Sequence, residues 1–167
     1  DVGIETQYLM LTGGYGISGE EFTSSIIMQN TQPVYGIQID ILADPPYLTG
    51  TNYYFNSLLD LEDWTLTGSM VGNIYRLIAF DNTLLHPINS GAFHIADITY
   101  DVVAGAPDSS LVDISIDDAI ISDVNSLPMH VKGIPNNVYI GQPPVVYSIE
   151  NISGELTPGG TGSFEIH

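Results

Sequence analysis

The segment from Val34 to Ile41 constrains the fold of this chain more than any other feature of the sequence. Ile37, Ile39 and Ile41 alternate with small or polar residues, so one face of an extended strand can be buried while the other contacts water. Asp44-Pro45-Pro46 ends the pattern, because proline cannot donate a hydrogen bond to a β-ladder. The sequence therefore predicts a half-buried central strand here.

Eight further segments are typical of strands and are separated by turn residues. They cover residues 2–11, 21–29, 48–55, 64–71, 73–81, 92–103, 111–121 and 130–140. Residues 58–63 are expected to form a loop or a short helical turn. Nine strands without a convincing helix predict an all-β fold, an antiparallel β-sandwich of the jelly-roll or immunoglobulin-like kind.

A glycine-rich stretch, residues 12–19, joins the first two strands. Its spacing Gly14-x-Gly16-x-x-Gly19 matches a dinucleotide-binding fingerprint, but two glutamates and a β-branched run follow where a bound phosphate would need a helix N-terminus. We therefore interpret the stretch as a turn whose glycines supply backbone dihedrals that other residues avoid.

The charge balance excludes several classes of partner. Twenty acidic residues face only Arg76 and Lys132, and the net charge of −18 repels nucleic acid and anionic membrane surfaces. No apolar run is long enough to insert into a membrane, since a span needs about 18 residues. Without cysteine the chain has no disulfide, no thiolate nucleophile and no cysteine-based zinc site. A surface of uncharged polar residues is expected of an exported protein. A first residue Asp1 is expected after removal of a secretion signal, or equally in a shortened chain.

No set of residues combines a nucleophile, a base and an orienting group, so we expect no catalytic residue and no enzyme activity. The four histidines have no metal-binding spacing. Adjacent carboxylates such as Asp117 and Asp118 would point to opposite faces of a strand and could not flank one glycosidic bond. Asp117, Asp118, Asp123 and Asn125 do place oxygen ligands around one turn, which calcium could use, although turns are rich in these residues in any case.

Aromatic residues leave a carbohydrate ligand open. Trp64, Tyr53 and Tyr54 could stack on sugar rings, or they could fill the core of a sandwich. Asn151-Ile152-Ser153 matches the N-glycosylation pattern and marks Asn151 as a candidate acceptor.

Four segments, in this order along the chain, resemble the cohesin domains. They are residues 30–49, 75–81, 88–102 and 120–131. The resemblance covers roughly residues 2 to 141, and it implies a nine-stranded jelly roll that acts outside the cell as a noncatalytic protein-binding module. Calcium-bearing dockerins are the partners of the cellulosomal members, and a dockerin-like protein is the partner implied here.

The resemblance also implies a partner surface, on the sheet face that carries strands 34–41, 64–71 and 74–81. By alternation, Gln38 and Asp40 are the best candidates on the first of these strands. On the strand 74–81 the alternation leaves two choices open, since either Tyr75 and Leu77 or Arg76 and Ile78 point outward. Arg76, as the sole arginine, is also a candidate for an internal ion pair.

Residues 142–167 continue beyond the cohesin-like domain, residues 1–141, as a second unit. Ile149-Glu150 and Leu156 to Gly162 echo Ile4-Glu5 and Leu11 to Gly16, which indicates a partial copy of the first two strands. The copy would expose apolar edges unless it found another acceptor. The candidate donor-strand residues are Val145, Val146, Tyr147, Ile149, Ile152, Phe164 and Ile166.

Two explanations of this extension stay open. The chain could be a piece of a tandem array, or the extension could be donated head-to-tail to another copy, building a filament or surface array. As a function for the whole protein, we favour this assembly into a filament or surface array over a solitary cohesin-like adhesin.

Overall fold

A computed structural model describes residues 5–57 and 63–142 of the chain. Within these ranges the chain forms strands and no helix, so the predicted all-β class is confirmed. The strands are β1 (Thr6–Leu11), β2 (Gly14–Gly16), β3 (Glu21–Asn30), β4 (Gly36–Asp44), β5 (Leu48–Phe55), β6 (Trp64–Val71), β7 (Ile74–Asp81), β8 (Gly91–Val102), β9 (Leu111–Ser122), β10 (Pro128–Ile134) and β11 (Asn136–Ile140).

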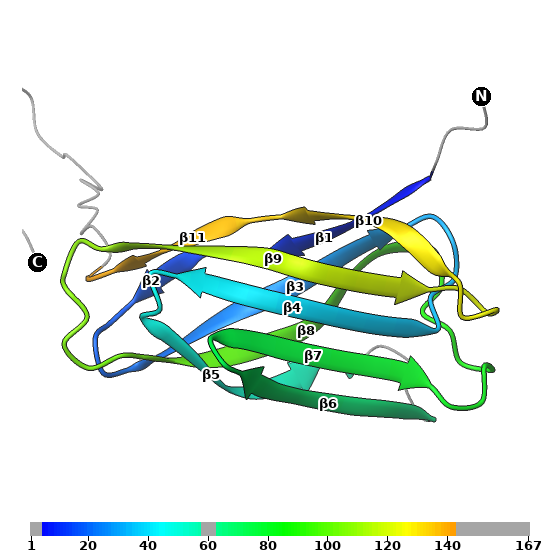
Figure 1. Cartoon of the computed structure of the whole chain (residues 1–167), viewed down its shortest axis with the longest axis horizontal. Helices are drawn as coiled ribbons and strands as arrows, with labels where there is room; N and C mark the ends of the chain where they lie inside the picture. Colours follow the sequence, from blue (N-terminus) through cyan, green and yellow to red (C-terminus); the bar gives the residue numbers. More distant parts are fainter. Residues whose placement is uncertain (1–4, 58–62, 143–167) are drawn as a thin grey trace, which may run out of the picture.

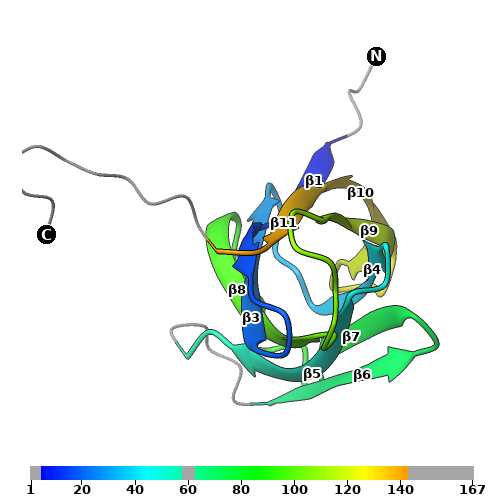
Figure 2. The same ribbon diagram turned by 90° about the vertical axis from the view of Figure 1, so that its left-hand side faces the viewer.

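The strands follow one another in a single hydrogen-bonded order, β5-β8-β3-β1-β10-β9-β4-β7-β6, with β11 attached to β9 and β2 attached to β11. Figure 1 shows the long strands running side by side, and Figure 2, which looks along them, shows that they wrap almost completely around a core. The two ends of the order, β5 and β6, pack against each other without pairing. The predicted jelly-roll sandwich is therefore a nearly closed one.

Two details of the strand pattern differ from the prediction. A short strand, β2, lies inside the glycine-rich stretch and pairs in parallel with β11. The last predicted strand is divided at Pro135, since β10 pairs in parallel with β1 while β11 pairs antiparallel with β9. Both differences depend on strands outside the local segment, since β2 and β10 pair with partners more than 100 residues away along the chain and β11 pairs with β9, so local alternation could not predict them.

The core is built from the inward side chains of alternating strand residues. In β4, Ile37, Ile39 and Ile41 are all nearly inaccessible, as predicted, and β4 ends at Asp44 before the two prolines. Aliphatic side chains dominate the centre; those with no exposed surface include Leu9, Ile26, Met28, Ile39, Leu77, Ile95, Ile98, Ile114, Ile121 and Ile140.

Tyr75 joins the two ends of the sheet. Its ring lies beside Gly50 of β5, where an added Cβ would come within 2.2 Å of its Cδ2 atom, and beside Gly68 of β6, where an added Cβ would come within 2.7 Å of its hydroxyl oxygen. Tyr53 covers Gly68 as well and donates a 3.2 Å hydrogen bond to the carbonyl of Leu66. The two glycines thus let β5 and β6 approach closely around one buried aromatic ring.

None of the described residues belongs to a helix long and apolar enough to cross a membrane.

Candidate functional site

The outward side chains of β9, β4, β7 and β6 form one continuous surface, which we call the outer face. Strand register places Gln38 between Ile78 of β7 and Ile120 of β9. Phe80 lies one outward position further along β7 from Ile78, and the exposed fractions of Phe80 and Ile120 are 43% and 45%. The centre of the outer face is therefore apolar, with one amide side chain in the middle.

An ion pair lies next to the apolar row formed by Ile78, Phe80 and Ile120. Arg76 Nε donates a 2.7 Å hydrogen bond to Asp40 Oδ1, and the Arg76 Nη2 atom bonds the second carboxylate oxygen, so the contact is bidentate. Asp40 is only 3% exposed, whereas the side chain of Arg76 stays 38% exposed above it. The hydrogen bond with Asp40, the charge of Asp40 and the charge of Asp118 on the next strand raise the pKa of Arg76.

The structure resolves the orientation of β7 that alternation left open. Arg76 and Ile78 point to the outer face, while Tyr75 and Leu77 are 2% and 0% exposed and lie in the core. Tyr75 is therefore not available to a partner, because its ring fills the space between the two ends of the sheet. Asp40 does lie on the outer-face side of β4, but Arg76 covers it.

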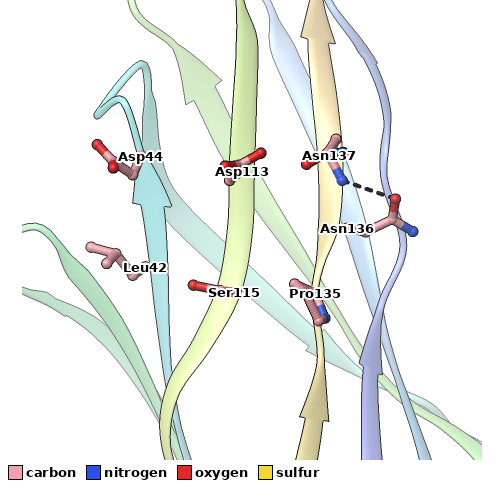
Figure 3. A pocket seen from close by; sticks show the side chains of 7 residues that line it. All are labelled: Leu42, Asp44, Asp113, Ser115, Pro135, Asn136 and Asn137. Carbon is pink, nitrogen blue, oxygen red and sulfur yellow. Dashed lines mark hydrogen bonds between the residues drawn. The ribbon is translucent and has the colours of Figure 1, made fainter.

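A shallow hollow of about 510 Å³ lies at the other end of the outer face, between the end of β4, the start of β9 and the β10–β11 junction (Figure 3). Asp44, Asp113 and Asn137 are direct neighbours across three strands in this hollow. With its nitrogen turned toward Asp113, the Asn137 amide donates a 2.6 Å hydrogen bond to Asp113 Oδ1. The sequence offered no sign of this hollow, because strand register alone brings its three segments together.

A scan of the sequence against models of protein families gives no match, and a comparison with curated proteins gives none either. Solved structures do match. The cohesin CaCohA2 of Clostridium acetobutylicum, solved in complex with CaDoc0917, gives a TM-score of 0.70 at 19% identity and covers 81% of this chain and 99% of that one. The chain has a cohesin fold.

Two further cohesins agree. The sixth cohesin of scaffoldin B from Acetivibrio cellulolyticus, in complex with the Cel5 dockerin, gives a TM-score of 0.68 at 13% identity, covering 82% of this chain and 100% of that one. A non-cellulosomal cohesin of the archaeon Archaeoglobus fulgidus gives 0.67 at 14% identity, covering 83% and 93%. The predicted resemblance to cohesins is thereby confirmed for the fold.

The four candidate calcium ligands do not meet in this cohesin fold. Asp117 and Asp118 lie in β9, and five residues of extended chain span about 16 Å, so Asp118 and Asp123 are too far apart for one cation. Asp123 Oδ1 instead accepts hydrogen bonds from the backbone N–H groups of Asn125 and Leu127, at 2.8 and 2.9 Å, and so shapes the turn. Among the described residues no group of three or more His, Cys, Asp or Glu could hold a metal ion.

A β-bulge changes the expected orientation of the adjacent carboxylates. The pairing of β9 with β4 skips Asp117, since Asp118 opposes Asp40 and Ile116 opposes Ile41. Both Asp117 and Asp118 are consequently exposed, although two consecutive residues of a regular strand would point to opposite faces.

A second bulge assembles a serine, a histidine and an aspartate on the opposite side of the molecule. Because the pairing of β8 with β3 skips Ile95, His94 and Asp97 lie on the same face. Asp97 Oδ1 bonds both Ser25 Oγ, at 2.6 Å, and His94 Nε2, at 2.8 Å. The aspartate thus stands in the middle, whereas a catalytic triad requires the histidine between serine and aspartate.

The candidate sugar platform is not assembled as a unit. Trp64 is 8% exposed and its Nε1 donates a 2.7 Å hydrogen bond to the carbonyl of His86, so its ring belongs to the core. Tyr53 is half-buried against Gly68, and Tyr54 alone of the three is well exposed, at 61%. Asn151 and all seven candidate donor-strand residues lie outside the described ranges.

Proposed function

We propose that this protein is a noncatalytic module of extracellular protein assembly that binds a partner protein through its outer face. One observation carries the proposal: the exposed side chains of Ile120 and Phe80 and the half-buried side chain of Ile78 lie beside the bidentate Arg76–Asp40 pair. Apolar side chains at the centre with an arginine nearby are the composition that energetically important parts of protein interfaces share.

The kind of partner is suggested by the solved cohesins. Several of the matched structures are complexes of a cohesin with a dockerin, and we extend this to the present chain as a dockerin-like partner. A net charge of −18 favours a basic partner surface and fast association at low salt.

Calorimetric titration with dockerin modules from the same source, in calcium-containing buffer, tests this proposal. Ile120→Lys should weaken binding by about tenfold or more, because it places a charge in the apolar centre. Val103→Lys is the matched control, since Val103 is also an exposed aliphatic residue, at 40%, but follows β8 away from the outer face. Equal affinities for both variants, or no dockerin bound by the unmodified protein, would argue against the outer face as the binding site.

Assembly by strand addition is a second function, which the partial repeat in residues 143–167 favours. In the structure β1 pairs with both β3 and β10, and β3 pairs with both β1 and β8. The places that a copy of the first two strands would occupy are therefore filled, and the copy needs an acceptor elsewhere.

Negative-stain microscopy of the full chain and of a variant lacking residues 143–167 tests this second function. We expect filaments or arrays from the full chain alone. Polymers from the shortened chain, or only monomers of the full chain at high concentration, would contradict it and leave a solitary adhesin.

A further inference from the structure

The sheet has two ends in its main order, β5 and β6. An end strand presents a row of unpaired backbone N–H and C=O groups that another strand can join. Proteins usually block such edges with charged side chains, proline or a β-bulge. The two end strands of this sheet, β5 and β6, differ in whether a β-bulge interrupts them.

Strand β5 is interrupted and β6 is not. The pairing of β5 with β8 skips Thr51 between Gly50 and Asn52, which bends the strand at its edge. In contrast, β6 pairs with β7 over eight consecutive residues without a shift of register. Residues 64–71 of β6 contain no charged residue and no proline, in a chain with twenty acidic residues. The described edge of β6 is therefore regular and uncharged, and a strand that joined it would have to replace the hydrogen bond from Tyr53 of β5 to the Leu66 carbonyl.

The hydrogen bonds show which backbone groups of β6 form this free edge. Asn82 N–H donates to the carbonyl of Asp63, so the groups of Asp63 point toward β7, and in an antiparallel pair the direction alternates along the strand. The carbonyl of Leu66 accepts its hydrogen bond from Tyr53 of β5, on the side away from β7. By the same alternation the backbone groups of Gly68 and Met70 also point away from β7.

We propose that this edge of β6 accepts the segment Val145 to Ile152 of a second copy of this chain. The inference rests on the proposed assembly by strand addition and identifies its acceptor. Twenty-five residues, 143–167, follow the described part of the chain, and the segment has eight residues, as β6 does. Apolar residues at every second position, Val145, Tyr147 and Ile149, give it a strand pattern.

Electrostatics favours the same pairing. Two copies that each carry a net charge of −18 repel one another, and like charges directly opposite across a strand pair are destabilising. Both end strands, β5 and β6, are uncharged, so a second copy meets little repulsion at either edge, and the bulge of β5 leaves β6 as the regular one. The donor segment carries one acidic residue, Glu150, and its exposed neighbours on β6 would be uncharged.

Met70→Pro provides the test, with Met70→Ala as its matched control. Proline removes the N–H that points away from β7, so it blocks strand addition without removing a β6–β7 hydrogen bond, while alanine removes the same side chain and keeps the N–H. Full-length proteins are imaged by negative stain, and thermal unfolding verifies that each variant is folded. We expect filaments from the unmodified chain and from Met70→Ala, and folded monomers from Met70→Pro.

Other outcomes would overturn the inference. Filaments of Met70→Pro would exclude the β6 edge as acceptor while leaving strand addition itself intact. If Met70→Pro does not fold, Leu66→Pro decides, with Leu66→Ala as its control, since the Leu66 N–H also points away from β7; filaments of Leu66→Pro would equally exclude β6. Monomers of the unmodified full chain, including any in which the segment binds its own β6, would contradict both the acceptor and the proposed strand addition.

Discussion

The hydroxyl of Tyr100 is buried without a hydrogen-bond partner among the described residues. Burial first, and then the neighbouring Tyr75, raise the pKa of Tyr100. An unpaired buried hydroxyl costs free energy that a phenyl ring does not.

Tyr100→Phe should accordingly leave stability unchanged or raise the free energy of unfolding by about 1 kcal/mol. Urea denaturation measures the change, and Tyr15→Phe is the control because Tyr15 is 48% exposed. A loss of more than about 1 kcal/mol in Tyr100→Phe alone would mean that the hydroxyl has a partner in solution.

Asp81 holds the loop that follows β7. Its carboxylate accepts hydrogen bonds from the backbone N–H groups of Thr83, Leu84 and His86, at 2.9, 3.0 and 2.8 Å, and from the Thr83 hydroxyl. Burial alone would raise the pKa of Asp81, but these hydrogen bonds outweigh burial and lower it. Leu84 adopts a positive φ of 60°, which is unfavourable for leucine and which these bonds help to maintain.

A lowered pKa makes the contribution of Asp81 depend on pH in a defined direction. The native state binds the proton less readily than the unfolded state, so the stabilisation is present above the ordinary pKa of 3.8 and is lost as pH falls through the lower native value. Asp81→Asn should cost on the order of 2 kcal/mol at neutral pH, and the cost should shrink below about pH 4. Thermal unfolding between these pH values measures it, and a cost independent of pH would contradict the assignment.

At the scale of the elements, the contact of β5 and β6 around Tyr75 gives the next prediction. Gly50→Ala would place a methyl group 2.2 Å from Tyr75 Cδ2, closer than two carbon atoms can approach, so the strands must move apart. We expect a loss of about 3 kcal/mol in the free energy of unfolding. Thr49→Ala, on the exposed side of the same strand, should cost less than about 0.5 kcal/mol. Similar stabilities of the two variants would show that β5 and β6 are not held at this distance.

The elements also show how far the sequence could predict this structure. Alternating isoleucines and the terminal prolines predicted β4 correctly, because these signals act within a few residues. Strand β2, the division at Pro135 and the bulge at Asp117 could not be predicted, since each depends on a strand paired from a distant part of the chain. Alternation within the strand predicted Gln38 and Asp40 as residues of the partner surface. It could not predict that Ile78 and Ile120 flank Gln38, because these neighbours are set by the register between strands.

At the scale of the whole molecule, the net charge of −18 sets the response to salt. Only the positive charges of Arg76 and Lys132 balance any of the negative charges of the carboxylates. Repulsion among the carboxylates therefore destabilises the compact state. The melting temperature should rise by several degrees between about 10 mM and about 0.5 M sodium chloride, because salt screens this repulsion. A melting temperature that is constant or falls with salt would show that the carboxylates lie too far apart to matter.

The central claim we propose is that a second copy of this chain joins the molecule at the edge of β6. Amide hydrogen exchange, followed residue by residue in the full chain and in a variant lacking residues 143–167, tests it most directly. The N–H groups of Gly68 and Met70 should exchange rapidly in the shortened protein and become protected when the full chain assembles. Equal exchange of these two amides in both proteins, under conditions where the full chain is assembled, would contradict the account.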